Sequence, residues 1–298
     1  MENRQTLVTE YGTRVTITWQ CDGILLGHGI SRFNALTSFS GASQADVVRL
    51  HFGMKGNYAF SYKQLGQTYD LIGGHHNIMY SKEFDITVQN KTLVLETFGI
   101  QFPVDQFIQF TQNASDSLKR FAEDILAGKN VMLSERWGAI DSPIQQVLQQ
   151  IIHCKYNDDL KKLFLLSKSI ELLVLCADAY EHTQQETFIK SIADKEKLVA
   201  VRDLINERVQ DPPNLTQIAR LVGLNEYKLK RGFKEVFNNT VFGYLAEQRL
   251  HLAHRYLKDT RKTAAEISYE LGYATPQHFS NAFRKKFGMP PSAARNNP

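Results

Sequence analysis

Short stretches with alternating apolar and polar side chains mark the first hundred residues, a pattern typical of half-buried β-strands. Thr13–Trp19 alternates with a period of two, and Phe84–Val88 does the same. Turn-forming residues separate such stretches, among them Asp22–Gly23, Lys55–Asn57 and Gly73–Gly74. Several short strands at this spacing predict a small barrel or sandwich over residues 1–110.

After Pro103 the apolar positions follow helical spacing, as in Leu118, Phe121, Ile125 and Leu126. A second helix is expected to begin at Asp141–Pro143, with Val147, Leu148, Ile151 and Ile152 on its apolar stripe.

The most apolar helix is predicted over Leu160–Tyr180, where apolar residues cover more of the circumference than one packed face needs. Either the β-rich part covers this helix completely, or some of its surface meets another subunit.

A polar stretch at Thr183–Thr187 predicts a linker, and helical periodicity then runs from about Asp194 to Phe287. The chain is therefore predicted to be an α+β protein. Its expected parts are a β-rich domain at 1–110, a helical region at 111–182, a linker at 183–193 and an all-α domain at 194–298.

Charge is distributed unevenly along the 298 residues, a length that suits two domains. From Lys195 onward there are 18 Lys and Arg against 10 Asp and Glu, whereas the first 194 residues hold 17 against 21. A basic third joined to an acidic remainder is typical of a nucleic-acid-binding module attached to another domain. Taken alone, the excess of basic residues could equally be a basic face that is exposed to solvent and binds nothing.

The three cysteines, Cys21, Cys154 and Cys176, are odd in number and far apart in sequence. They are expected to be free thiols in a reducing compartment, without a disulfide framework or a zinc site. No apolar run reaches the roughly 18 residues of a membrane helix, and the polar start Met1–Thr6 does not resemble a signal peptide. We therefore expect a cytoplasmic protein.

Two stretches near the end repeat each other: Ile218–Leu224 matches Ile267–Tyr273 at an offset of 49. A second set matches at an offset of 50, pairing Leu229, Phe233, Lys234 and Phe237 with Phe279, Phe283, Arg284 and Phe287. In each copy a short helix ends at a glycine, an apolar residue fills the turn, and Asn225 or Thr275 caps the next helix. Each copy is predicted to be a helix-turn-helix whose second helix can enter a major groove.

A helix over Val241–Leu257 is predicted between the copies, with Leu245, Leu250 and Ala253 on its apolar side. Such a helix would hold the two recognition helices about 34 Å apart, one turn of DNA.

Here the sequence resembles the AraC/XylS family of bacterial transcription regulators, over about a third of the chain. The matching residues are Phe233–Lys234, Tyr244–Leu245, Arg249–Leu250, Ala253, Ala265–Ile267, Leu271–Tyr273, His278–Ser280, Phe283–Lys285 and Phe287–Ser292, within Leu215–Arg295. Two departures stand out. Asn238 replaces a common glycine but tolerates the left-handed conformation. Ala294 replaces a common aromatic, which would loosen the last helix.

The resemblance implies that residues near the start of each recognition helix touch bases. Carried onto this sequence, these are Tyr227, Lys230, Arg231, Pro276, Gln277, Ser280 and Asn281. Lys and Arg can donate to guanine, and Gln and Asn can pair with adenine. The expected phosphate contacts are Lys228, Lys234, Arg284, Lys285 and Lys286. Lys230 and Arg231 could instead touch only phosphates.

In the N-terminal part, Gly74–Tyr80 and Leu163–Leu173 are similar to the branch of the family that responds to iron-siderophore complexes such as pyochelin. The resemblance implies a small-molecule effector sensed by residues 1–110, a homodimer formed through the helical region, and an activator that works with RNA polymerase. Other small effectors are the alternative to an iron-siderophore complex.

His75 and His76 raise the question of a metal site. Neighbouring residues on a strand point to opposite faces, and no nearby carboxylate completes a ligand set, so we interpret both as turn or surface histidines. Trp19 and Trp137 are expected to be core or pocket-wall aromatics. The aromatic supply for a pocket wall also includes Phe33, Phe39, Phe52, Tyr58, Phe60 and Tyr62.

An enzyme is the competing class, because some regulators with this DNA-binding unit carry a DNA-repair methyltransferase. That activity needs a cluster of four thiolates, which three scattered cysteines cannot build. The sequence also lacks a P-loop, a dinucleotide fingerprint and a nucleophile elbow. We therefore predict no catalysis and no cofactor, and the remaining alternative is a DNA-binding protein without an effector.

Overall fold

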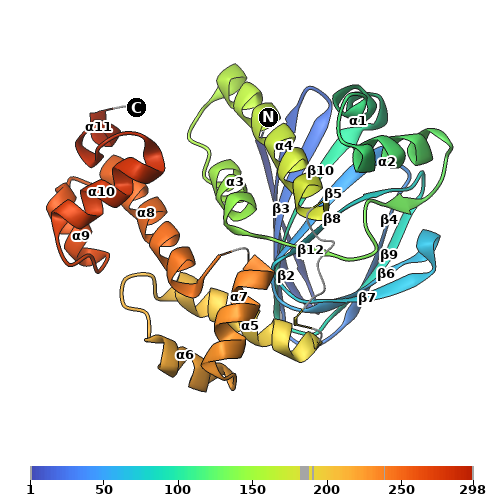
Figure 1. Cartoon of the computed structure of the whole chain (residues 1–298). Coiled ribbons are helices and arrows are strands. Elements are labelled where there is room, and N and C mark those ends of the chain that lie inside the picture. The colour runs from blue at the N-terminus through green and yellow to red at the C-terminus, as the bar shows by residue number, and fades with distance from the viewer. Residues whose placement is uncertain (1, 182–187, 190, 238, 297–298) are drawn as a thin grey trace. The chain divides into compact units, whose positions relative to one another are not determined.

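The computed structural model describes residues 2–181, 188, 189, 191–237 and 239–296. The chain divides into two compact units, residues 1–186 and 187–298 (Figure 1). All the described strands lie in the first unit, together with four α-helices, and the described part of the second unit is helical. The predicted α+β class, with a β-rich start, a helical middle and an all-α end, is confirmed.

A large antiparallel sheet forms the centre of the first unit, in the order β1-β2-β3-β10-β5-β8-β11, with β12 also paired to β8. Its strands are β1 (Glu2–Thr9), β2 (Gly12–Cys21), β3 (Ile24–Phe33), β5 (Val47–Lys55), β8 (His75–Tyr80), β10 (Val94–Pro103), β11 (Val131–Met132) and β12 (Gly138–Ala139). The alternation predicted at Thr13–Trp19 lies within β2, and the turn predicted at Asp22–Gly23 joins β2 to β3.

A smaller antiparallel sheet has the order β4-β9-β6-β7. Its strands are β4 (Ser38–Ser43), β6 (Tyr58–Tyr62), β7 (Gln67–Leu71) and β9 (Phe84–Asn90), and the short helix η1 (Lys63–Leu65) joins β6 to β7. Gly66 ends this helix with φ +63°, a left-handed conformation that suits glycine. The alternation predicted at Phe84–Val88 lies within β9.

The large sheet has apolar contacts on both faces. On one face, Phe52, Phe98 and Ile100 share a cluster with the helices of this unit. These helices are α1 (Val104–Thr111), α2 (Asp116–Leu126), α3 (Ser142–Ile152) and α4 (Asp158–Glu181). On the other face, Met79 and Leu95 join a cluster with the inner side of the small sheet. The large sheet is therefore the middle of three layers.

All six residues of β8 are buried, as expected for a strand covered on both faces. The interpretation of His75 and His76 as turn or surface histidines is therefore wrong: they are 6% and 0% exposed. The two rings do point to opposite faces, since His75 bonds Tyr58 of the small sheet while His76 packs against Tyr180 of α4. Their burial depends on both covering layers, which lie far away in sequence.

Helix α3 begins where the sequence predicts its cap. Asp141 precedes α3, and its side chain accepts a hydrogen bond of 3.1 Å from the backbone N–H of Ile144. Helix α4 spans the predicted apolar stretch and buries Leu165, Leu172 and Cys176 against the sheet.

The other side of α4 is not covered. Leu160, Leu163 and Val174 are 58%, 63% and 59% exposed, so the alternative in which the β-rich part covers the helix completely is wrong. These positions fall on one side of the helix, because their spacing follows its period.

The second unit contains seven helices in its described part: α5 (Ile192–Glu207), α6 (Leu215–Val222), α7 (Glu226–Phe237), α8 (Val241–Asp259), α9 (Ala264–Glu270), α10 (Pro276–Phe287) and α11 (Pro291–Asn296). Helix α5 begins at Ile192, two residues before the predicted start. The predicted linker residues Thr183–Thr187 lie outside the described residues. Among the described helices, none combines the length and the apolar character needed to cross a membrane.

Candidate nucleic-acid interface

The first helix-turn-helix is formed by α6 and α7. Asn214 and Gln217 form a capping box at the start of α6, and Gly223 ends this helix with φ +62°. The side chain of Asn225 accepts a 2.7 Å hydrogen bond from the backbone N–H of Lys228, which caps α7 as the sequence predicts. Asn238, expected to turn the chain after this helix, lies outside the described residues.

The second helix-turn-helix, α9 and α10, has the same construction. Thr263 and Glu266 form its capping box, Gly272 has φ +73° in the turn, and Thr275 accepts a 3.2 Å bond from the N–H of His278. Helix α11 follows, and Ala294, which replaces a common aromatic, is 1% exposed in the apolar cluster of this half.

In each copy the carbonyl of the turn glycine accepts a hydrogen bond from a cation on another helix. Lys197 of α5 lies 3.0 Å from the carbonyl oxygen of Gly223, and Arg249 of α8 lies 3.3 Å from that of Gly272. Arg249 also donates to Val209 O at 2.9 Å and to Gln210 O at 3.1 Å. Burial lowers the pKa of the Arg249 guanidinium, and its carbonyl partners replace lost water. Sequence reasoning missed both cations, because no local pattern marks such contacts.

On α7 the side chains of Tyr227, Lys230, Arg231 and Lys234 are exposed and recur at the spacing of one helical face. They line an apolar groove of about 490 Å³ together with Leu215, Thr240, Val241 and Phe242. The buried side of the same helix carries Leu229, Phe233 and Phe237.

Some of the predicted contacts on α7 already have partners within the chain. Lys228 forms a 2.6 Å ion pair with Asp194, and Lys230 lies 3.5 Å from Glu226. Arg231 donates to the hydroxyl of Tyr227 at 3.0 Å, and its guanidinium lies 4.1 Å from the ring centre of Phe188. Asp194 and Phe188 precede α7 by more than thirty positions in sequence, so periodicity could not associate them with it.

On α10 the exposed residues Gln277, Asn281, Arg284 and Lys285 lie on the side opposite to Phe279 and Phe283, which are 0% exposed. The predicted contacts Pro276 and Ser280 are half-buried at the edge of this surface, and Lys286 forms a 2.9 Å ion pair with Glu247.

The first unit carries a different polar feature, between its two sheets. The Tyr58 hydroxyl lies 2.7 Å from Nε2 of His51 and 2.8 Å from Nε2 of His75, and Nδ1 of His75 bonds the carbonyl of Ile72. Because Nδ1 of His75 donates to a carbonyl, its Nε2 accepts from Tyr58, whose oxygen then accepts from His51. Burial lowers the pKa of His51 to about 4 and raises the pKa of Tyr58, so these two side chains are uncharged at neutral pH.

Trp137 packs against this histidine pair, with ring centres 5.1 Å from His75 and 5.8 Å from His51. Its indole Nε1 is buried without a hydrogen-bond partner in the described part of the chain. Such a donor is costly to bury unless something else satisfies it. No group of three or more His, Cys, Asp or Glu placed to hold a metal ion occurs within the described residues.

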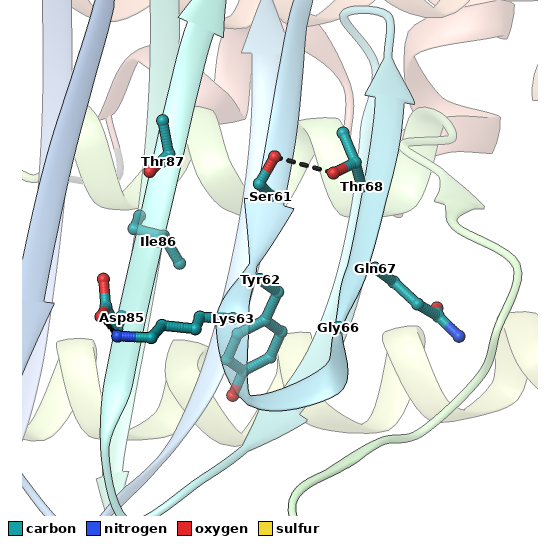
Figure 2. Close-up of a pocket in the computed structure, with 9 residues that line it drawn as sticks. All are labelled: Ser61, Tyr62, Lys63, Gly66, Gln67, Thr68, Asp85, Ile86 and Thr87. Carbon is teal, nitrogen blue, oxygen red and sulfur yellow. Dashed lines mark hydrogen bonds and ion pairs between the residues drawn. The ribbon is translucent and has the colours of Figure 1, made fainter.

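A depression of about 330 Å³ lies on the small sheet (Figure 2). Lys63 and Asp85 pair across it at 3.0 Å, and Ser61 and Thr68 share a 2.8 Å hydrogen bond. These polar groups already satisfy one another, whereas the buried indole donor of Trp137 has no partner within the described residues. The three cysteines are free, and burial raises the pKa of the Cys21 thiol to about 11.

The double helix-turn-helix, with a polar face on each second helix, defines a DNA-binding transcription regulator. The sequence profile described as "Helix-turn-helix domain" matches residues 218–297, and the profile "Regulatory protein PchR N-terminal domain" matches residues 32–190. The chain belongs to the AraC/XylS family of transcription regulators and carries a PchR-type N-terminal domain.

Regulatory protein PchR of Pseudomonas aeruginosa is 39% identical over 118 residues, which cover 39% of this chain and 40% of PchR. Regulatory protein SoxS of Escherichia coli K12 is 33% identical over 99 residues, or 32% of this chain and 92% of SoxS. The crystal structure of an AraC-type regulator from Chromobacterium violaceum aligns with 27% identity and a TM-score of 0.33, over 36% of this chain and 95% of that one.

We predict that Gly272→Ala destabilises the protein more than Gly288→Ala. Both glycines have φ just above +70°, so alanine costs about 1–2 kcal/mol at either position. A Cβ on Gly272 would also lie 2.6 Å from Nη2 of Arg249, whereas no atom lies within 4 Å of one on Gly288. The displaced Arg249 bonds should add about 1 kcal/mol. Urea unfolding followed by circular dichroism measures the free energy of unfolding of both variants. Equal losses of this free energy in Gly272→Ala and Gly288→Ala would contradict the role of Arg249.

Proposed function

We propose that the protein is an effector-responsive activator that reads two adjacent major grooves with α7 and α10. The observation that carries this proposal is the construction of these two helices. Each buries aromatic rings on one side and presents exposed polar side chains on the other. Because its partner is DNA, we assign the protein to the cytoplasm, where it would act with RNA polymerase.

We propose Tyr227, Lys230, Arg231, Pro276, Gln277, Ser280 and Asn281 as the base contacts. Arg231 and Gln277 are the strongest candidates, because both are exposed on the sides of α7 and α10 opposite to the buried phenylalanines. A guanidinium can donate two parallel bonds to guanine, and a carboxamide can do the same for adenine by donating and accepting.

We propose Lys228, Lys234, Arg284, Lys285 and Lys286 as phosphate contacts. The ion pairs of Lys228 with Asp194 and of Lys286 with Glu247 would have to open for these two lysines to reach a phosphate. Lys285 is exposed on the outer side of α10, so it is the clearest test of this group.

We expect Arg231→Ala and Gln277→Ala to weaken binding to the selected operator by about 1–3 kcal/mol each, and to relax specificity at separate base pairs. Lys285→Ala should instead weaken all duplexes about equally and flatten the salt dependence. Titrations against a duplex selected from a random library and against a shuffled duplex measure both effects. Equal losses on both duplexes for Arg231→Ala would show that Arg231 does not read bases.

A small molecule bound in the first unit is proposed as the signal. A basic module of about 100 residues suffices to bind DNA, so the larger unit needs a purpose of its own. The cluster of side chains around Trp137 supports this assignment, because the buried Nε1 of Trp137 has no partner within the described residues and its ring packs against His75 of the His51–Tyr58–His75 chain. The resemblance suggests an iron-siderophore complex such as ferric pyochelin. A ligand can shift the equilibrium between the active and the inactive arrangement of the protein only by its difference in affinity for the two.

Ferric pyochelin is expected to change the fluorescence of Trp137 saturably in a Trp19→Phe chain. The matched control is Trp137→Phe, which keeps Trp19, a residue packed in the cluster on the helical side of the sheet. Removing residues 1–186, which form the first unit, should abolish any transcriptional response to the compound while DNA binding persists. If no compound from the native host gives a saturable change, the alternative of an effector-independent DNA-binding protein gains support.

The exposed side of α4 supports a homodimer formed through the first unit. Leu160, Leu163 and Val174 form an apolar stripe of the kind that marks interfaces. We predict that the pair Leu163→Glu and Val174→Glu raises the dimer dissociation constant at least about tenfold, because buried unpaired charges oppose association. The control is Leu36→Glu, which changes a side chain 63% exposed elsewhere in this unit. Analytical sedimentation measures the dimer dissociation constant of each chain. A wild-type chain that is monomeric at tens of micromolar would contradict the proposal.

A further inference from the structure

The chain enters the second unit along the side of α7. The backbone N–H groups of Phe188 and Ile189 donate to the two carboxylate oxygens of Glu235, at 2.9 and 3.1 Å. One carboxylate thus holds two successive amides that precede helix α5. Hydrogen bonds to a charged acceptor are stronger than neutral ones, so this segment is fixed to the recognition helix.

A glycine on α7 makes room for this segment. Gly232 is buried, and a Cβ built on it would lie 2.8 Å from Cδ1 of Ile189 and 2.9 Å from Cδ1 of Leu198. Ile189 is itself 1% exposed. The segment is therefore packed against α7 and not only hydrogen-bonded to it, which places Phe188 next to the exposed face of the helix.

Phe188 contacts two of the proposed base-reading residues. The Arg231 guanidinium carbon lies 4.1 Å from the centre of the Phe188 ring, and the Tyr227 ring packs edge-on against Phe188 at 5.9 Å. Arg231 also donates a hydrogen bond from Nη1 to the Tyr227 hydroxyl at 3.0 Å, so Phe188, Tyr227 and Arg231 each contact the other two. The guanidinium is thus held by its position over the Phe188 ring and by the hydrogen bond of one nitrogen.

This arrangement suits base recognition. A guanidinium stacks through its face and donates hydrogen bonds in its plane, so an aromatic beneath it restrains the group while leaving donors free. An arginine without such support must lose rotamer freedom when it binds.

We propose that Phe188 is a positioning residue for DNA reading, which holds the guanidinium of Arg231 in the conformation that contacts a base. This inference rests on the proposed role of Arg231. Phe188 acts through Arg231 and requires no contact of its own with DNA. Because Phe188 lies where the chain enters the second unit, a displacement of this segment would remove the support of Arg231.

The test uses the full chain with Phe188→Ala, Phe188→Tyr, Arg231→Ala and the double variant Phe188→Ala/Arg231→Ala. The probes are a duplex selected from a random library by the wild-type chain and a shuffled duplex. Phe188→Ala is expected to weaken binding to the selected duplex about fivefold, the size of an exposed cation–π contact, without affecting the shuffled one. Phe188→Tyr should restore binding, and the double variant should bind no more weakly than Arg231→Ala.

The matched control is Tyr269→Ala, which removes an aromatic ring that is 60% exposed on α9. Tighter or unchanged binding by Phe188→Ala would overturn the inference, as would additive losses in the double variant. Equal weakening on both duplexes with a lower melting temperature would assign Phe188 a structural role only. If Arg231→Ala loses specificity and Phe188→Ala does not, the inference fails while the proposed function stands; if Arg231→Ala does not discriminate, the reading role itself fails.

Discussion

Burial of one face of each recognition helix determines which of its side chains can reach DNA. Phe233 and Phe283 are fully buried at equivalent positions of the two copies. Burying a phenylalanine stabilises by about 1.5–3 kcal/mol, more than a single exposed polar contact contributes. The orientation of α7 and α10 is therefore set by the core of the second unit. Arg231 and Gln277 are exposed as a consequence, because an α-helix that buries one side must present the other.

The turns at Gly223 and Gly272 set how the two helices of each copy are oriented relative to one another. Each turn needs a left-handed glycine, and each glycine carbonyl accepts from a cation on a separate helix, Lys197 for Gly223 and Arg249 for Gly272. Arg249 also bonds the carbonyls that follow α5, so a single side chain ties α8 to both halves of this unit. These contacts join the two helices of each copy to helices outside it, so the placement of the two second helices depends on the whole second unit.

The first unit combines a packed sheet with a polar interior. Its large sheet is covered on both faces, which would favour apolar residues throughout, yet His51 and His75 of this sheet form a chain of hydrogen bonds with Tyr58 of the small sheet. Buried polar groups that satisfy one another specify geometry more than they add stability. The buried indole Nε1 of Trp137 beside them has no hydrogen-bond partner within the described residues, and the proposed effector site rests on it.

The sequence alone determined the parts of this protein that depend on local, periodic signals. The two helix-turn-helix copies, their glycines, the caps Asn225 and Thr275, and the strands predicted in β2 and β9 all follow from residues close together along the chain. The burial of His75 and His76, the uncovered side of α4, and the contacts of Phe188 and Arg249 were decided only by the tertiary structure. These features join residues that are distant in sequence, and a side chain's burial depends on which layer covers it. Periodicity identifies the face of an element, whereas the identity of the neighbour on that face depends on how the whole chain packs.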